Sequence, residues 1–186
     1  MTTATFETHF PGLTSGTWTI DPMHSDVGFT VRHLMSKVRG NFSTFEGELD
    51  IAENPLESSV TATIDLSSVD TRNTDRDNHL RSADFFSVDE ETSMTFASTT
   101  VRYDGEDLIA SGNLTIKGVS KPVDLKLEFL GVEIDPYGNT RAGFEATTTI
   151  SRKDWGITTN VPLEGDRLMI GDAVNVFIAI EAVRQA

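Results

Sequence analysis

The sequence has no cysteine. Disulfide bonds, thiolate nucleophiles and zinc sites built on cysteine are therefore excluded. Basic residues are also few, because 15 Lys and Arg stand against 29 Asp and Glu and leave a net charge of −14. Nucleic acids and anionic membrane surfaces both attract basic patches. The overall charge thus argues against either of them as a partner.

Long apolar runs are absent as well. No run approaches the roughly 20 residues that a membrane-spanning helix requires, so we expect no stable membrane insertion. The N-terminal stretch MTTATFETHFPGLTSGT lacks both the basic and the apolar segment of a secretory signal peptide. We therefore expect a soluble cytoplasmic protein.

Common motifs of cofactor, metal and hydrolase sites are missing too. The chain contains neither G-x-G-x-x-G nor a P-loop, and it has no G-x-S-x-G. Its four histidines, at positions 9, 24, 33 and 79, show no H-x-x-x-H or H-E-x-x-H spacing. We predict no catalytic residue, no metal site and no resident cofactor.

Most of the chain shows the alternation of apolar and polar residues that is typical of β-strands. In one long segment, Val27, Phe29 and Val31 share a face. About nine such segments are spaced along the chain, and two phase slips, near Ser43 and near Leu130, indicate β-bulges that bend a sheet toward closure. This pattern favours a closed antiparallel barrel over a flat sandwich.

The length of 186 residues fits a single domain. Residues 1–16 are rich in Thr and Gly and predict a loose N-terminal arm, whereas residues 17–186 predict the barrel domain. Only one segment favours a helix, which Thr74 or Asp75 is expected to cap. Eleven Phe against two Trp and two Tyr suggest an interior lined with rings that need no hydrogen bond.

Basic groups stand at the ends of several apolar faces. His33 ends one strand face, Arg152 ends another, and Arg76 and His79 share a face of the predicted helix. A buried charge costs several kcal/mol unless it is partnered. Two interpretations stay open: an internal ion-pair network, for example Asp77 with Arg152, or a site for the polar head of a ligand.

Five motifs recur in a fixed order along the chain. They are W-x-I-D-x-x-H-S-x-V-x-F-x-V-x-H-L-M from Trp18, G-x-F-x-x-F-x-G from Gly40, R-D-x-H-L-R-S-x-D-F-F from Arg76, G-x-L-T-I-K-G-V-S-K-P-V from Gly112 and R-x-D-W-G from Arg152. Together they resemble the YceI-like family of polyisoprenoid-binding proteins. The resemblance covers residues 17–182, nearly the whole chain.

The resemblance implies an extended, lipocalin-like barrel. With the strand pattern, we expect an all-β fold: an eight-stranded antiparallel β-barrel with one or two short helices. The resemblance also implies an apolar tunnel for an isoprenoid, an isoprenoid quinone or a similar amphiphile, and a homodimer. The recurring polar positions of its motifs fall on His24, Ser25, His33, Arg76, Asp77, His79 and Arg152.

We expect a ligand to contact the apolar residues of the inward faces and the polar groups at their ends. These residues are Val27, Phe29, Val31, His33, Phe42, Ile64, Arg76, His79, Leu80, Phe85, Phe96, Leu114, Leu125, Leu127, Phe144, Ile150, Arg152, Trp155, Val176 and Ile178.

The main functional hypothesis is a carrier or sequestering protein for a long apolar or amphiphilic molecule. Such a molecule is a polyisoprenoid, an isoprenoid quinone, a prenyl phosphate or a lipid. One alternative is a hydrolase or isomerase that acts on a lipophilic substrate through His33, His79 and Asp77. The other is a stress-related, partner-binding protein whose barrel is filled by its own side chains.

Overall fold

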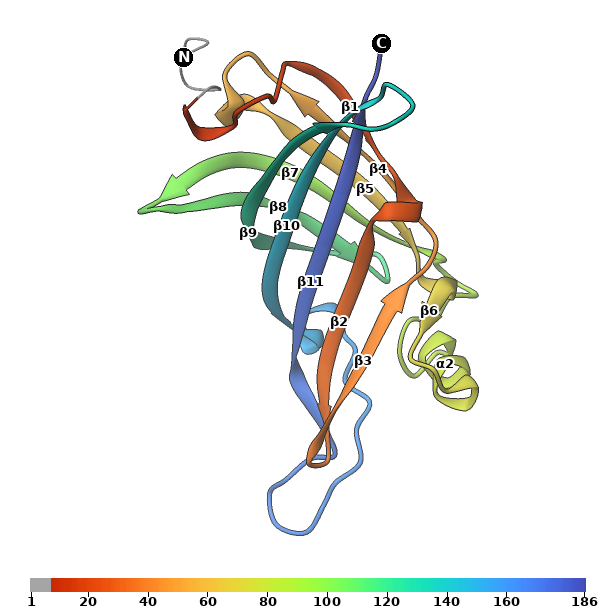
Figure 1. Cartoon of the computed structure of the whole chain (residues 1–186). Helices are drawn as coiled ribbons and strands as arrows, with labels where there is room; N and C mark the ends of the chain where they lie inside the picture. The colour runs from red at the N-terminus through yellow and green to blue at the C-terminus, as the bar shows by residue number, and fades with distance from the viewer. Residues whose placement is uncertain (1–7) are drawn as a thin grey trace.

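Eight strands close into an antiparallel β-barrel in the computed structural model, which describes residues 8–186 (Figure 1). Around the ring the order is β1-β4-β5-β7-β8-β9-β10-β11, and β11 pairs with β1 to complete it. These strands are β1 (Gly16–Ile20), β4 (Phe45–Ile51), β5 (Ser59–Asp65), β7 (Ser93–Asp104), β8 (Asp107–Ile116), β9 (Val119–Ile134), β10 (Thr140–Ser151) and β11 (Ile170–Arg184). The expected closed, eight-stranded all-β barrel is confirmed.

One end of the barrel is extended by three further strands, β2 (Asp26–His33), β3 (Ser36–Phe42) and β6 (Val69–Asp70). β11 pairs with β1 near its C-terminal end and with β2 along its first part. β1 and β2 are therefore two halves of one broken strand, separated by the 3-10 helix η1 (Pro22–His24). Figure 1 shows β2 and β3 projecting beyond the ring as a long hairpin.

Both predicted phase slips correspond to irregularities in the strands: one is an interruption and the other is a β-bulge. β3 ends at Phe42 and β4 begins at Phe45, so Ser43 and Thr44 interrupt the strand where the apolar residues change parity. Between β9 and β10 the register shifts so that Phe144 pairs with Phe129, and Leu130 is left out of the pairing. An unpaired residue on one strand bends it and increases its twist. These irregularities give the sheet the curvature that closure requires.

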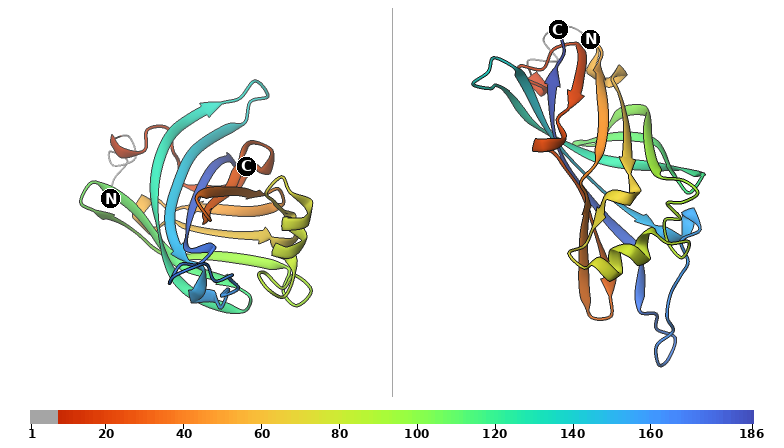
Figure 2. Two further views of the ribbon diagram at one scale, coloured as in Figure 1. Left: turned by 90° about the horizontal axis from the view of Figure 1, so that it is seen from below. Right: turned by 90° about the vertical axis from the view of Figure 1, so that its right-hand side faces the viewer.

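Helix α2 (Thr74–Arg81) lies at the same end of the barrel as the β2–β3 hairpin (Figures 1 and 2). Its N-cap is Asn73, whose Oδ1 accepts a hydrogen bond from the Arg76 backbone N–H at 2.9 Å. The expectation of Thr74 or Asp75 at this position was wrong by one or two residues. Asn is as good a cap as Asp, so the composition alone did not separate these candidates.

Besides η1, three further segments form short 3-10 helices. They are η2 (Pro55–Glu57), η3 (Leu66–Ser68) and η4 (Arg152–Trp155). Within residues 8–186, no helix has the length and apolar character needed to cross a bilayer.

The expected N-terminal arm divides into two parts. Residues 1–7 lie outside the described residues. From residue 8 onward the segment packs against the barrel: Phe10 and Leu13 are each 5% exposed and cluster with Trp18 and Ile51. Phe10 also contacts Phe129 edge-on, with ring centroids 5.5 Å apart. The described part of the arm thus packs on the barrel, because its apolar side chains cover the end of the barrel opposite α2.

Candidate functional site

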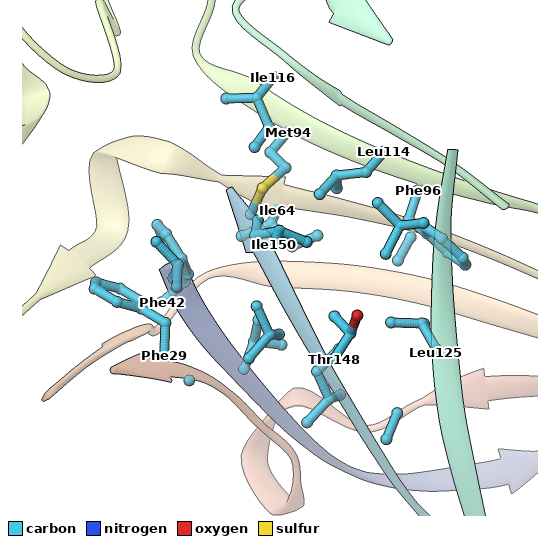
Figure 3. Close-up of a pocket in the computed structure, with 18 of the residues that line it drawn as sticks. Phe29, Phe42, Ile64, Met94, Phe96, Leu114, Ile116, Leu125, Thr148 and Ile150 are labelled. Carbon is cyan, nitrogen blue, oxygen red and sulfur yellow. The ribbon is translucent and has the colours of Figure 1, made fainter. Parts of the chain in front are cut away.

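The interior of the barrel holds a cavity of about 430 Å³. Its wall consists almost entirely of aliphatic and aromatic side chains, as Figure 3 shows. Small-molecule sites in proteins are mostly apolar and have volumes of roughly 300–1,000 Å³. The cavity therefore has the size and chemistry of a site for an apolar molecule. It also shows that the filled interior of the partner-binding alternative was wrong.

Strand alternation explains why so many apolar side chains meet here. Val176 of β11 pairs with Phe29 of β2, and Ile178 of β11 pairs with Val27, so these four residues face inward together. Their neighbours on the outside, such as Phe177, are exposed. Because every strand of the ring repeats this pattern, the inward faces enclose one continuous apolar wall.

All twenty residues that the sequence singled out lie on the cavity wall. They are Val27, Phe29, Val31, His33, Phe42, Ile64, Arg76, His79, Leu80, Phe85, Phe96, Leu114, Leu125, Leu127, Phe144, Ile150, Arg152, Trp155, Val176 and Ile178. Whether each of them contacts a ligand stays a prediction.

The cavity wall also contains residues that the sequence did not single out. Met94 and Ile116 lie beside Ile64 and Ile150 in Figure 3, and Thr148 directs its hydroxyl among apolar neighbours. Thr148 shares its parity with Phe144 and Ile150, so alternation alone would have found it. Phe10, which lines the other end of the cavity, gave no such signal because its segment has no period.

His33 lies half-buried on the cavity wall, where β2 leaves the barrel. Within residues 8–186, its imidazole has no hydrogen-bond partner, although its backbone carbonyl accepts from Ser36 Oγ at 3.2 Å. An imidazole that borders an apolar cavity without a protein partner is available to a polar group of a ligand.

Arg76 lies on the face of α2 that lines the cavity. Its Nε donates to Thr71 Oγ1 at 2.7 Å and its Nη2 to the Thr71 carbonyl at 2.8 Å. Thr71 in turn donates from its backbone N–H and its hydroxyl to the buried carboxylate of Asp77. The chain Asp77–Thr71–Arg76 fixes the guanidinium, and Nη1 has no hydrogen bond within residues 8–186.

His79 borders the mouth of the cavity and is exposed. Its Nε2 lies 2.8 Å from Asp84 Oδ2, and its ring meets the ring of Phe85 edge-on at 5.0 Å. Since Asp77 is bonded to Thr71 instead, the structure does not join His79 and Asp77 through a hydrogen bond. Within residues 8–186, no hydrogen bond joins His33, His79 and Asp77 to one another.

Arg152 is 6% exposed and lies at the end of β10, where η4 begins. Its Nε donates to the Gly171 carbonyl at 3.0 Å, and its Nη1 donates to the carbonyls of Ile157 and Thr159 at 2.8 and 3.0 Å. Burial lowers the pKa of this guanidinium, and the nearby Asp172 partly opposes that effect.

The proposed pairing of Arg152 with Asp77 was wrong. The acidic neighbour of Arg152 is Asp172, whose Oδ1 lies 3.8 Å from Nη2, too far for a hydrogen bond. Neither of these two buried atoms has a hydrogen-bond partner within residues 8–186. Asp77 was the wrong choice because its carboxylate already accepts two hydrogen bonds from Thr71, which is close to it in the sequence. Arg152 thus joins the chain after η4 to the start of β11.

The first motif also has structural roles. His24 Nδ1 lies 2.8 Å from Asp21 Oδ2, on the outside of the barrel. Ser25 Oγ accepts a hydrogen bond from the Glu181 backbone N–H at 3.0 Å and so joins the break between β1 and β2 to β11. No group of three His, Cys, Asp or Glu side chains in residues 8–186 is arranged to hold a metal ion.

Comparisons with known proteins agree with this architecture. A model of the YceI-like domain matches residues 18–182. Protein YceI of Escherichia coli O6:H1 is 41% identical over 164 residues, which cover 87% of this chain and 83% of that protein. The crystal structure of the Campylobacter jejuni YCEI protein is 34% identical with a TM-score of 0.69, over 89% of this chain and 96% of the other.

A polyisoprenoid binding domain from Saccharophagus degradans has the same fold at 18% identity. Its TM-score is 0.68, and the match covers 92% of this chain and all of that domain. With the domain match over nearly its whole length and a relative above 40% identity, the chain belongs to the YceI-like family.

Proposed function

We propose that the protein binds one long apolar or amphiphilic molecule inside the barrel, as a carrier or sequestering protein. The cavity of about 430 Å³, lined by the inward faces of the barrel strands, carries this proposal. A polyisoprenoid, an isoprenoid quinone or a prenyl phosphate has the required long apolar chain. The description of the Saccharophagus degradans domain as polyisoprenoid binding supports this choice of ligand class.

The affinity would come from burial of the ligand's apolar chain. Each buried CH₂ group contributes about 0.8 kcal/mol, so one five-carbon prenyl unit contributes several times that before ordering costs are subtracted. We expect affinity to increase by at least about tenfold for each added prenyl unit until the cavity is full, and then to level off.

The polar head would lie at the end of the cavity that α2 and the β2–β3 hairpin border. Within residues 8–186, the His33 imidazole and Nη1 of Arg76 are two groups at that end that make no hydrogen bond. Arg152 is less suited to this role, because three backbone carbonyls occupy its Nε and Nη1, and its remaining Nη2 lies 3.8 Å from Asp172 Oδ1. A quinone carbonyl or a phosphate oxygen would accept from the Arg76 guanidinium.

Binding rather than catalysis is the function that the site geometry favours. A hydrolase or isomerase acting through His33, His79 and Asp77 would require these groups to engage a common substrate atom. In the structure, Asp77 accepts from Thr71 and His79 pairs with Asp84. A homodimer and a cytoplasmic location stay predictions, which sedimentation and cell fractionation would test.

The proposal is tested on protein purified without refolding. Organic extraction followed by mass spectrometry should yield a co-purified prenyl lipid. Titration of the stripped protein with prenyl quinones and prenyl phosphates of increasing length should then give the length dependence described above. Absence of any extracted lipid, together with no binding of either series, would contradict the proposal.

A further inference from the structure

The turn between β2 and β3 has an unusual composition for its geometry. Three hairpins in residues 8–186 have two-residue turns, and two of them contain a glycine at positive φ: Gly105 in one, and Gly118 beside Lys117, also at positive φ, in the other. In the third the turn is Leu34-Met35, and Leu34 itself has φ 56°. Such turns favour Asn and Gly, and a bulky residue at positive φ is strained. Backbone strain of this kind is a reason to look for a function.

The side chains of this turn contribute little to the core. Met35 is fully exposed and Leu34 is 46% exposed. The loop before β11 lies against the turn: the Leu34 backbone N–H donates to the Met169 carbonyl at 2.8 Å, and Arg32 donates to the carbonyls of Leu34 and Leu168. Leu168 and Val161 of that loop are also exposed. We call these four apolar residues, Leu34, Met35, Val161 and Leu168, the apolar tip.

The β2–β3 hairpin, which carries Leu34 and Met35, is rich in cations. Between Asp26 and Glu46 the sequence has no acidic residue but contains Arg32, Lys37 and Arg39. Arg32 and Lys37 are directly paired across the hairpin, an arrangement of like charges that destabilises a sheet. None of the three takes part in an ion pair within residues 8–186.

The molecule as a whole is negatively charged, whereas the hairpin is positively charged. The net charge is −14, and the adjoining loop carries Glu164 and Asp166 beside Arg167. Charges more than about 8–10 Å away are largely screened at physiological ionic strength. A surface in contact with this end would therefore respond mainly to the local charges, in which Arg32, Lys37, Arg39 and Arg167 outnumber Glu164 and Asp166.

The apolar tip adjoins the cavity. His33, which precedes Leu34, lines the cavity wall, and so do Val161 and Met169 of the neighbouring loop. A surface that covered the apolar tip would thus meet the end of the cavity where α2 lies. An apolar ligand could move between that surface and the cavity over a short path, without its whole chain entering water.

We propose that the apolar tip docks on an anionic phospholipid bilayer. Leu34 and Met35 enter the headgroup region, and Arg32, Lys37 and Arg39 face lipid phosphates. This docking is peripheral and rests on the proposed function, because it explains how a carrier would load its ligand. At the opposite end of the molecule, Ile134 is also exposed, but its neighbour Glu133 and the nearby Asp135 are acidic, so that end serves as a comparison.

The test is co-flotation of the purified chain with vesicles. Vesicles of phosphatidylcholine alone are compared with vesicles that also contain phosphatidylglycerol. We expect binding only to the second kind, and expect added salt to weaken it. The double variant Leu34→Gly, Met35→Asn places Gly at the one position of the turn that has a positive φ, so it should fold at least as well as the parent. Its vesicle affinity should fall by about tenfold or more.

Two further variants test the cations of the hairpin and the acidic end around Ile134. Lys37→Gln with Arg39→Gln should weaken binding by about fivefold for each charge removed, since a cation near such a surface contributes about 1 kcal/mol. Ile134→Ser, at the acidic end, should bind vesicles like the parent. Thermal unfolding and titration with a prenyl quinone are measured for every variant, to show that fold and cavity are intact.

The possible results separate the two proposals. If the parent fails to bind anionic vesicles but binds prenyl quinone, docking is wrong and the proposed function stands. If it binds vesicles but no prenyl ligand, the proposed function fails. Equal vesicle binding by all variants would place the contact elsewhere and overturn the assignment. Self-association that the Leu34→Gly, Met35→Asn variant abolishes, without vesicle binding, would assign the apolar tip to a second copy of the chain.

Discussion

Arg152 Nη1 donates a hydrogen bond to the Ile157 carbonyl at 2.8 Å, inside the barrel wall. The same nitrogen donates to the Thr159 carbonyl at 3.0 Å. A side chain at the end of β10 thereby donates hydrogen bonds to the backbone carbonyls of a segment that forms no strand or helix of its own. Because that segment leads into the apolar tip, Arg152 connects the cavity wall to the proposed docking end.

Replacing Arg152 with Met should destabilise the protein. The change leaves the carbonyls of Ile157, Thr159 and Gly171 without this donor, and we expect the free energy of unfolding to fall by about 2–4 kcal/mol. Urea denaturation followed by circular dichroism measures it. Lys153→Met, which removes an exposed partner of Asp172, should change stability by less than about 1 kcal/mol. Equal losses in the two variants would show that the buried carbonyl contacts of Arg152 are unimportant.

Filling the cavity should block the ligand. Thr148 points into it, as Figure 3 shows, whereas Thr147 is exposed on the outside of the same strand. We expect Thr148→Phe to weaken binding of a long prenyl quinone by at least about tenfold, because the ring takes the space of the ligand chain. Thr147→Phe should leave the affinity unchanged. Isothermal titration with both variants checks this, and unaltered binding by Thr148→Phe would move the ligand out of the barrel.

The two tryptophans should respond differently to a ligand. Trp155 lines the cavity and donates from Nε1 to the Leu114 carbonyl at 2.9 Å. Trp18 is fully buried in the cluster around Phe10 and is not part of the cavity wall. A bound quinone should quench Trp155 fluorescence. The quenching should persist in Trp18→Phe and largely vanish in Trp155→Phe, and the reverse pattern would contradict the assigned site.

Stability at low pH should depend on Arg141. Its guanidinium, 2.7 Å from both Asp21 Oδ2 and Asp135 Oδ2, lowers the pKa of Asp21 to about 2 and also lowers that of Asp135. A carboxylate whose pKa is lower in the folded state stabilises above its unfolded value, 3.8 for Asp21, and loses this contribution as pH falls through the folded value.

Arg141→Met should therefore reduce the urea midpoint above about pH 4, with a difference from the parent that shrinks as the pH approaches 2. Arg102→Met, which breaks an exposed pair with Asp124, is the control and should have little effect. A difference that stayed constant across this pH range would mean that Arg141 stabilises through packing rather than through its carboxylate partners.

The cavity wall was predictable to a large extent because alternation is a local property. Val27, Phe29 and Val31 identify their inward face from spacing alone, and so do Phe144 and Ile150. The break at Ser43 was visible for the same reason. Each of these inferences needs only the neighbouring residues and the two-residue period of a strand.

The partners of the polar groups were not predictable in this way. Asp77 was expected to meet Arg152, but the carbonyls that Arg152 binds belong to an irregular segment whose path follows from tertiary packing. The packing of Phe10 against Phe129 likewise joins residues far apart in the sequence. Nor does alternation reveal that Leu34 adopts a positive φ, because that depends on how closely β2 and β3 pair.

The pairing of β1 with β11 has a practical consequence. Trp18 lies opposite Arg184, and the Gln185 backbone N–H donates to the Thr17 carbonyl at 2.8 Å, so the start of the barrel and the end of the chain form one seam. Figure 1 shows this seam at the far end of the molecule from the β2–β3 turn. Immobilising the protein on a sensor chip through its C-terminus would thus leave the apolar tip and the cavity mouth facing the flowing sample.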